Sequence, residues 1–178
     1  DYGAVLGQPD AFDEALAARL GPLSDIRFRS VLTARPRAVL EAALNVRTLG
    51  IHVKAEIMVP LVGTVREFNA QADVIRRTAA TVFAERGESI AYMLGTMIET
   101  PRGALIADSI GKQAEFFSFG TNDLTQMTLG FSRDDAGKFL PGYLKSGIYE
   151  HDPFRSIDQK GVGVLVQMAV EKGRSVRP

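Results

Sequence analysis

The sequence contains no cysteine, has only two histidines and carries no excess of charge of either sign. The lack of cysteine excludes disulfides, thiolate metal ligands and a cysteine nucleophile within these 178 residues. Lys and Arg number 21, as do Asp and Glu, so no global field attracts a polyanion. Nucleic acid and anionic membranes are therefore poor candidates as partners. His52 and His151 lack metal-ligand spacing with any partner, and we expect no histidine metal site.

The sequence also lacks an uninterrupted apolar run of membrane-spanning length. No N-terminal segment combines a basic start, an apolar core and a small-residue cleavage site. Hydrophobic residues make up 46% and charged residues 24%, as in an ordinary globular protein with one sizeable core. We therefore expect a soluble, untargeted chain, and the lack of cysteine fits the reducing cytoplasm.

Three short apolar runs in the middle of the chain predict buried strands at Ile57–Val59, Tyr92–Ile98 and Glu115–Gly120. Helical patterns separate them, with short joints. Strand, helix, strand, helix, strand in this order is typical of parallel βαβ units. The sequence therefore predicts an α/β fold with outer helices over a parallel sheet.

Two helices are predicted between these strands. Thr64 and Glu67 have the spacing of a capping box at the start of the first, and Gly87 ends it. Thr100 as N-cap and Pro101 at the first helical position open the second. The residues that recur at helical spacing are Phe68, Ala72, Ile75, Ala79 and Val82 in the first, and Gly103, Ile106, Ala107 and Ile110 in the second.

Patterns on either side of this central part are weaker. Residues 9–20 and 35–45 resemble amphipathic helices, and residues 25–32 between them alternate as a strand would. Residues 131–159 are rich in Gly, Pro and Asp, which predicts a long surface loop with short helical turns. A final helix is predicted at residues 161–173.

Carboxylates follow two of the predicted strands. Glu99 and Asp123 lie 24 residues apart, about one βα unit, and ligands in such sheets bind at the carboxyl ends of the strands. Such a pair could hold Mg²⁺, which takes oxygen ligands and is often shared with a phosphorylated substrate. Asn122 would add an amide, and Gly120 would let a ligand approach the backbone.

Each of these residues also has a simpler interpretation. Asp123 is equally suited to be the N-cap of the following helix, and Glu99 could favour a helix start. Arg133 has a planar fork that could grip a phosphate or carboxylate, but an arginine in a polar loop is more often solvated. The same holds for Arg102. Spacing alone leaves both interpretations open.

Longer motifs resemble a known family. "GTMIETPRGALIADSI", "EFFSFGTNDLTQMTLGFSRDD" and "GIYEHDPFRSIDQKGVGVLV" are similar to the phosphoenolpyruvate (PEP)-binding barrel domain of the pyruvate, phosphate dikinases. The middle motif is shared with PEP synthase and with the first enzyme of the bacterial sugar phosphotransferase system. "KFLPGYL" and "DPFRSIDQKGVG" favour the dikinases. The resemblance covers residues 34–178, whereas residues 1–33 match nothing recognisable.

The resemblance implies part of a (β/α)8 barrel that binds PEP or pyruvate through Mg²⁺. Glu99 and Asp123 match the family's magnesium ligands, the segment from Gly120 through Thr121 and Asn122 to Asp123 matches its substrate-binding segment, and Arg133 matches an arginine that contacts the substrate phosphate. The implied reaction is phosphoryl transfer between PEP and a phosphohistidine on a separate domain. An ATP-binding domain would complete the enzyme.

The sequence departs from the family pattern in two respects. The family's cysteine would follow Pro178, so no catalytic residue is expected within the chain, and Arg35, Arg37 and Arg47 do not match the family's other substrate-binding arginines. Eight βα units need roughly 250 residues. We expect either a fragment of a longer protein, inactive alone, or a non-catalytic remnant or assembly module of the same fold. Such a module would cover its exposed strand edges by association, as in a homo-oligomer.

Overall fold

A computed structural model describes residues 25–178, with side chains from residue 35 onward. The helix predicted at residues 9–20 lies outside the described residues, as does most of the segment 1–33. The described residues form two compact units. The first comprises residues 25–59 and 65–95, and the second comprises residues 60–64 and 96–178.

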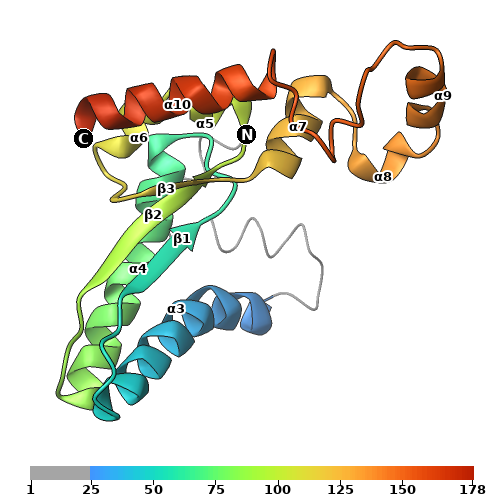
Figure 1. The fold of residues 1–178 in the computed structure, drawn as a ribbon. Helices are drawn as coiled ribbons and strands as arrows, with labels where there is room; N and C mark the ends of the chain where they lie inside the picture. The colour runs from blue at the N-terminus through green and yellow to red at the C-terminus, as the bar shows by residue number, and fades with distance from the viewer. Residues whose placement is uncertain (1–24) are drawn as a thin grey trace. The chain divides into compact units, whose positions relative to one another are not determined.

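Three strands form one sheet, in the order β1-β2-β3 (Figure 1). They are β1 (Ala55–Val59), β2 (Tyr92–Ile98) and β3 (Phe117–Phe119). The last two pair in parallel, with Thr96 opposite Phe117 and Ile98 opposite Phe119. The predicted α/β class is confirmed, and this sheet does not close into a barrel within residues 25–178.

The first unit packs two long helices, α3 (Asp25–Thr48) and α4 (Val65–Arg86), with β1. Every apolar residue that predicted α4 is buried, and Gly87 follows the helix with a positive φ of 67°. Charged contacts from α3 to the end of α4 and to the residues just after it supplement this core. Arg37 pairs with Glu85, and Arg47 reaches Glu88 at 2.7 Å.

The strand predicted at residues 25–32 is wrong, because these residues belong to α3. Alternation over eight residues is too short to distinguish a half-buried strand from part of a helix. The helix predicted at residues 35–45 is confirmed and continues to Thr48. Pro36 lies inside α3, where it removes one backbone donor but does not end the helix.

In the second unit α5 (Pro101–Leu105), α6 (Ala107–Gly111) and α10 (Val162–Val176) pack together. The core cluster contains Ile98 of β2 and three alanines of these helices, and Phe117 and Phe119 of β3 pack against it. The alanines are Ala104, Ala107 and Ala169. These small residues allow the helices to approach the sheet closely. The ends of β2 and β3 therefore pack against the helices α5, α6 and α10.

Two helices replace the one predicted after Thr100. The threonine cap is confirmed, since Thr100 Oγ1 accepts the N–H of Gly103 at 2.9 Å. The backbone then leaves helical geometry at Ile106, with φ −114° and ψ 23°. The break separates α5 from α6, where the Cβ position of Gly111 is 3.7 Å from Gly173 Cα in α10. Periodicity did not reveal this break, because the apolar spacing from Gly103 to Ile110 continues across Ile106.

After β3 the chain forms three helices, α7 (Thr121–Leu129), α8 (Arg133–Ala136) and α9 (Leu140–Lys145). The long loop with helical turns predicted at residues 131–159 is confirmed. Ring contacts link its aromatic residues in series: Phe154, Phe131, Phe139, Tyr143 and Tyr149. The loop thus has a partly exposed aromatic cluster of its own. No helix among the described residues is long and apolar enough to cross a membrane.

Candidate functional site

Glu99 immediately follows β2 and is 3% exposed. Its Oε1 accepts the backbone N–H of Leu61 at 2.6 Å. A buried carboxylate loses hydration, and a charge-assisted bond from a main-chain N–H offsets part of that loss. The contact fixes one carboxylate oxygen and leaves Oε2 for other partners.

The segment that supplies this N–H is attached to the end of β2 by three successive contacts. After the Leu61 contact, Thr100 Oγ1 donates to Val62 O at 3.1 Å, and the Arg102 guanidinium donates to Gly63 O. Arg102 therefore has a structural partner, a carbonyl, in this unit. The three contacts hold residues 61–63 beside Glu99.

Leu61 itself was missed by sequence reasoning. It has a positive φ of 54°, the one such value for a non-glycine residue in the described part of the chain, and its side chain is 57% exposed. Left-handed backbone is unfavourable for a bulky L-residue by roughly 1–2 kcal/mol. The conformation directs the N–H toward Glu99, a role for which no sequence pattern exists.

Asp123 lies in the first turn of α7, which begins at Thr121 with Gly120 as N-cap. The alternative prediction that Asp123 is the N-cap is wrong, because the N-cap is Gly120 and the helix starts three residues earlier than expected. At the third helical position its carboxylate still interacts favourably with the helix dipole. Gly120 supplies no side-chain cap, and its N–H donates to Ile98 O at 3.2 Å.

A side chain at position 120 would fill the space beside Glu99. A Cβ there would lie 2.7 Å from both Glu99 Cβ and Met97 Sδ, and closer still to Glu99 Oε2. Such separations are below van der Waals contact, so only glycine fits without movement of its neighbours. The backbone of α7 can therefore approach the end of β2 closely, which brings Asp123 to Glu99.

The structure brings Glu99 and Asp123 together. Burial raises the pKa of Glu99, the Leu61 N–H lowers it, and a hydrogen bond and the like charge of Asp123 raise it again, so the pKa lies above its ordinary value. Two carboxyl groups that share a site resist ionising together. A cation between them would remove that conflict.

We expect Glu99→Gln to raise the melting temperature of the chain at neutral pH in EDTA. The folded-state pKa of Glu99 is raised, so its protonated form adds stability that is present below the ordinary value of 4.5 and is lost as pH rises through the folded-state pKa. Glutamine keeps the acceptor for Leu61 but stays neutral. The difference in melting temperature should therefore widen as pH increases, as thermal unfolding across pH would measure.

Glu150→Gln is the matched control, because the same change is made at an exposed position. It should leave the melting temperature within about 1 °C of the unmodified chain at every pH. An equal melting temperature for Glu99→Gln and the unmodified chain at neutral pH would contradict the assignment of the strained carboxylate pair.

Arg133 opens α8, and its side chain is exposed. Its backbone N–H donates to Gln126 Oε1 at 2.7 Å, and its guanidinium carbon lies 5.7 Å from the ring centre of Phe154. Phe154 is positioned by an Asx turn, in which Asp152 Oδ1 accepts the Phe154 N–H at 2.8 Å. Among the described residues, no ion pair joins the Arg133 guanidinium to a carboxylate.

The remaining candidates are distributed as follows. Thr121 and Asn122 are exposed in the first turn of α7. His52 and His151 are exposed. Arg37 pairs with Glu85 of α4 and Arg47 with Glu88 just after it, and Arg35 is exposed.

The two carboxylates of Glu99 and Asp123 fit magnesium better than a metal whose ligands must all come from protein side chains. Among the residues whose side chains the structure describes, no group of three or more His, Cys, Asp and Glu could hold a metal ion. Glu99 and Asp123 supply two carboxylates, and Mg²⁺ typically takes one or two and completes its shell with water and substrate oxygens. The buried carboxylate of Glu99 and the half-buried carboxylate of Asp123 beside it are consistent with such an ion.

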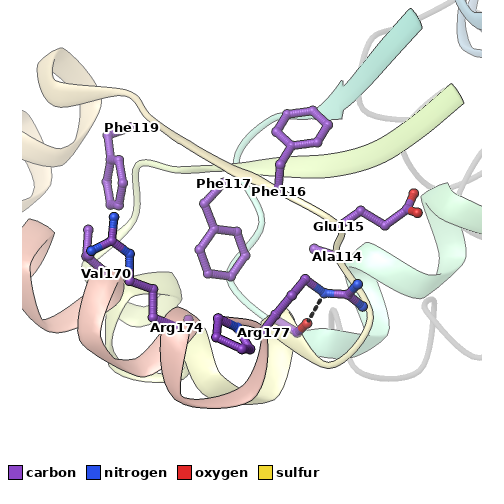
Figure 2. Close-up of a pocket in the computed structure, with 11 residues that line it drawn as sticks. Ala114, Glu115, Phe116, Phe117, Phe119, Val170, Arg174 and Arg177 are labelled. Carbon is purple, nitrogen blue, oxygen red and sulfur yellow. Dashed lines mark hydrogen bonds between the residues drawn. The ribbon is translucent and has the colours of Figure 1, made fainter. Parts of the chain in front are cut away.

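A separate cavity of about 280 Å³ lies between β3 and the C-terminal part of α10 (Figure 2). Phe117 projects into it, and Arg177 Nε donates to Gly111 O at its edge. A Cβ at Gly173 would be 2.8 Å from the Phe117 ring, so glycine is required at this helix position too. None of the predicted site residues lines this cavity.

Comparison with known proteins identifies the family. The family model described as "PEP-utilising enzyme, PEP-binding domain" matches residues 23–177. The chain is 60% identical over 153 residues to "Pyruvate, phosphate dikinase 1, chloroplastic" of Arabidopsis thaliana and 56% identical over 153 residues to "Pyruvate, phosphate dikinase 2" of Zea mays. These alignments cover 86% of this chain but only 16% and 17% of the relatives. The chain therefore belongs to the PEP-utilising enzymes, as a PEP-binding domain that corresponds to about a sixth of its relatives' length.

Proposed function

We propose that the chain binds PEP or pyruvate in a pyruvate, phosphate dikinase-like phosphotransferase, with Glu99 and Asp123 as ligands of Mg²⁺. The observation that carries this proposal is the convergence of the two carboxylates at the carboxyl end of β2 and the start of α7. Two like-charged side chains from separate segments destabilise the folded chain when they lie together. A cation bound between them would remove this repulsion. The matching motifs and the high identity to dikinases support the same site.

Each of the proposed site residues would have a distinct role in binding. Glu99, oriented by the Leu61 N–H, and Asp123 would hold the ion, and the first turn of α7 from Thr121 would favour an anionic substrate through its partial positive charge. Gly120 and Asn122 would complete the substrate-binding segment. When bound, Mg²⁺ would supply a positive charge that stabilises the enolate and the phosphoryl oxygens.

Arg133 would bind the substrate phosphate. Its guanidinium carbon lies 5.7 Å from the ring centre of Phe154, a cation–π contact that favours one orientation of the side chain. An arginine can bind phosphate through two parallel hydrogen bonds, so pre-orientation favours affinity. The arginine would offset charge on the phosphoryl group during transfer between PEP and a phosphohistidine.

The wider arrangement follows from the same family membership. The three strands would belong to a (β/α)8 barrel, and the phosphohistidine and ATP-binding domains would lie elsewhere in a full-length protein. Residues 34–178 would belong to the partial barrel, and α3 extends the described structure N-terminally across residue 33 to Asp25. The cytoplasmic location stays a prediction, since the Arabidopsis relative is named as chloroplastic.

Calorimetry with oxalate, a planar analogue of the pyruvate enolate, tests the proposal. We expect the 178-residue chain to bind oxalate in Mg²⁺ and not in EDTA. Binding that is equal under both conditions would contradict the magnesium site. A coupled assay for pyruvate formation then distinguishes an active enzyme from a binding domain, and we expect no turnover by this chain alone.

A further inference from the structure

Gln126 lies between Asp123 and Arg133 in the sequence, and it has no role in the site proposed above. It is half-buried on α7, one turn after Asp123. Its Nε2 donates to Asp123 Oδ1 at 3.0 Å, while its Oε1 accepts the backbone N–H of Arg133 at 2.7 Å. One amide group thus contacts the carboxylate on the helix and the first residue of α8.

These two contacts determine which way the amide faces. A main-chain N–H needs an acceptor and an ionised carboxylate needs a donor, so only one orientation of the Gln126 amide satisfies both Asp123 and Arg133. Glutamine is the residue type of this length with a donor and an acceptor on one planar group. Glutamate would place an acceptor against Asp123, and methionine would offer neither contact.

The backbone of Gln126 is part of the same connection. Its carbonyl accepts the N–H groups of Gly130 at 2.9 Å and Phe131 at 3.2 Å, which ends α7 at a left-handed glycine. The side chain and main chain of this residue therefore hold both ends of the turn that leads to Arg133. Gln126 therefore both holds the Asp123 carboxylate and fixes the turn that leads to Arg133.

We propose that Gln126 is a positioning residue that orients Asp123 for the cation and fixes Arg133 relative to it. This inference rests on the proposed function, because it assigns Asp123 to the metal. A partner that donates to one carboxylate oxygen leaves the other oxygen directed elsewhere, and groups that orient a metal ligand in this way contribute to metal affinity. The hydrogen bond to the Arg133 main chain also connects the proposed cation site to the backbone of the arginine proposed to bind phosphate.

The test compares Gln126→Met with Gln113→Met in the 178-residue chain. The two substitutions make the same chemical change, and Gln113 is exposed beyond α6. We expect Gln126→Met to weaken Mg²⁺-dependent oxalate binding by about 10-fold to 100-fold, whereas Gln113→Met leaves it unchanged. Amide hydrogen exchange at Arg133, measured without ligand, should become at least about threefold faster only in Gln126→Met.

The outcomes separate this inference from the proposed function. If the unmodified chain binds magnesium and oxalate but Gln126→Met binds them equally well, the inference is overturned and the proposed function stands. If the unmodified chain shows no magnesium-dependent binding, both are overturned. Thermal unfolding of the variants confirms that Gln126→Met is folded, and the exchange measurement reports the hydrogen bond to Arg133 directly.

Discussion

Asp123→Ala should abolish magnesium-dependent oxalate binding while leaving the chain folded. Groups that only orient a metal ligand are worth about 10-fold to 100-fold in affinity, so removal of a ligand itself should cost at least about 100-fold. The substitution also removes a negative charge that raises the pKa of the buried Glu99. We therefore expect the melting temperature in EDTA to stay the same or to rise, as calorimetry and thermal unfolding would show.

Asp134→Ala is the control for this experiment. Asp134 is an exposed carboxylate in the first turn of a helix, so its removal makes the same change in charge and in helix-dipole interaction at a different place. It should bind magnesium and oxalate as the unmodified chain does. Retained binding in Asp123→Ala would remove the metal-site assignment.

Gly120→Ala should both destabilise the second unit and eliminate ligand binding. The φ of −88° is accessible to alanine, so the effect is steric. The new Cβ would approach Glu99 Cβ and Met97 Sδ to 2.7 Å, and the first of these atoms lies next to the main chain, where movement is restricted. Overpacking of this kind typically costs about 1–3 kcal/mol in the free energy of unfolding. Denaturant unfolding would measure the cost, and calorimetry would measure the loss of magnesium-dependent oxalate binding.

Gly137→Ala provides the comparison. Gly137 has an ordinary helical φ of −56°, and a Cβ there would meet no atom within 4 Å. Replacing it should be neutral, or stabilising by up to about 1 kcal/mol through the lower entropy of the unfolded chain. Equal free energies of unfolding for Gly120→Ala and Gly137→Ala would show that the close approach at Glu99 is not needed.

The parts of the fold that sequence predicted well are those determined by local patterns. The bounds of β2 follow from an apolar run that ends at a carboxylate, and the start of α5 follows from Thr100 and Pro101, which stabilise a helix start by their own chemistry. The buried face of α4 follows from its period. The Thr64 capping box stays a prediction, as do the functional roles of the site residues.

The parts that sequence did not predict depend on partners distant in the chain. The break at Ile106 accompanies packing against α10, and the Leu61 contact with Glu99 spans 38 residues. Gln126 was missed because an i to i+3 contact with Asp123 has meaning only when its second partner, the N–H of Arg133, is known. Sequence could place the acidic residues at strand ends, but their supporting residues required the fold.

The main-chain origin of the Leu61 hydrogen bond has a practical consequence for mutagenesis. Alanine scanning removes side chains beyond Cβ, so it would leave this donor intact and report residue 61 as unimportant. Proline, which lacks an N–H and cannot adopt a positive φ, or an amide-to-ester exchange would remove the donor. A map of this site drawn only from side-chain truncation would therefore omit the group that orients its most deeply buried carboxylate.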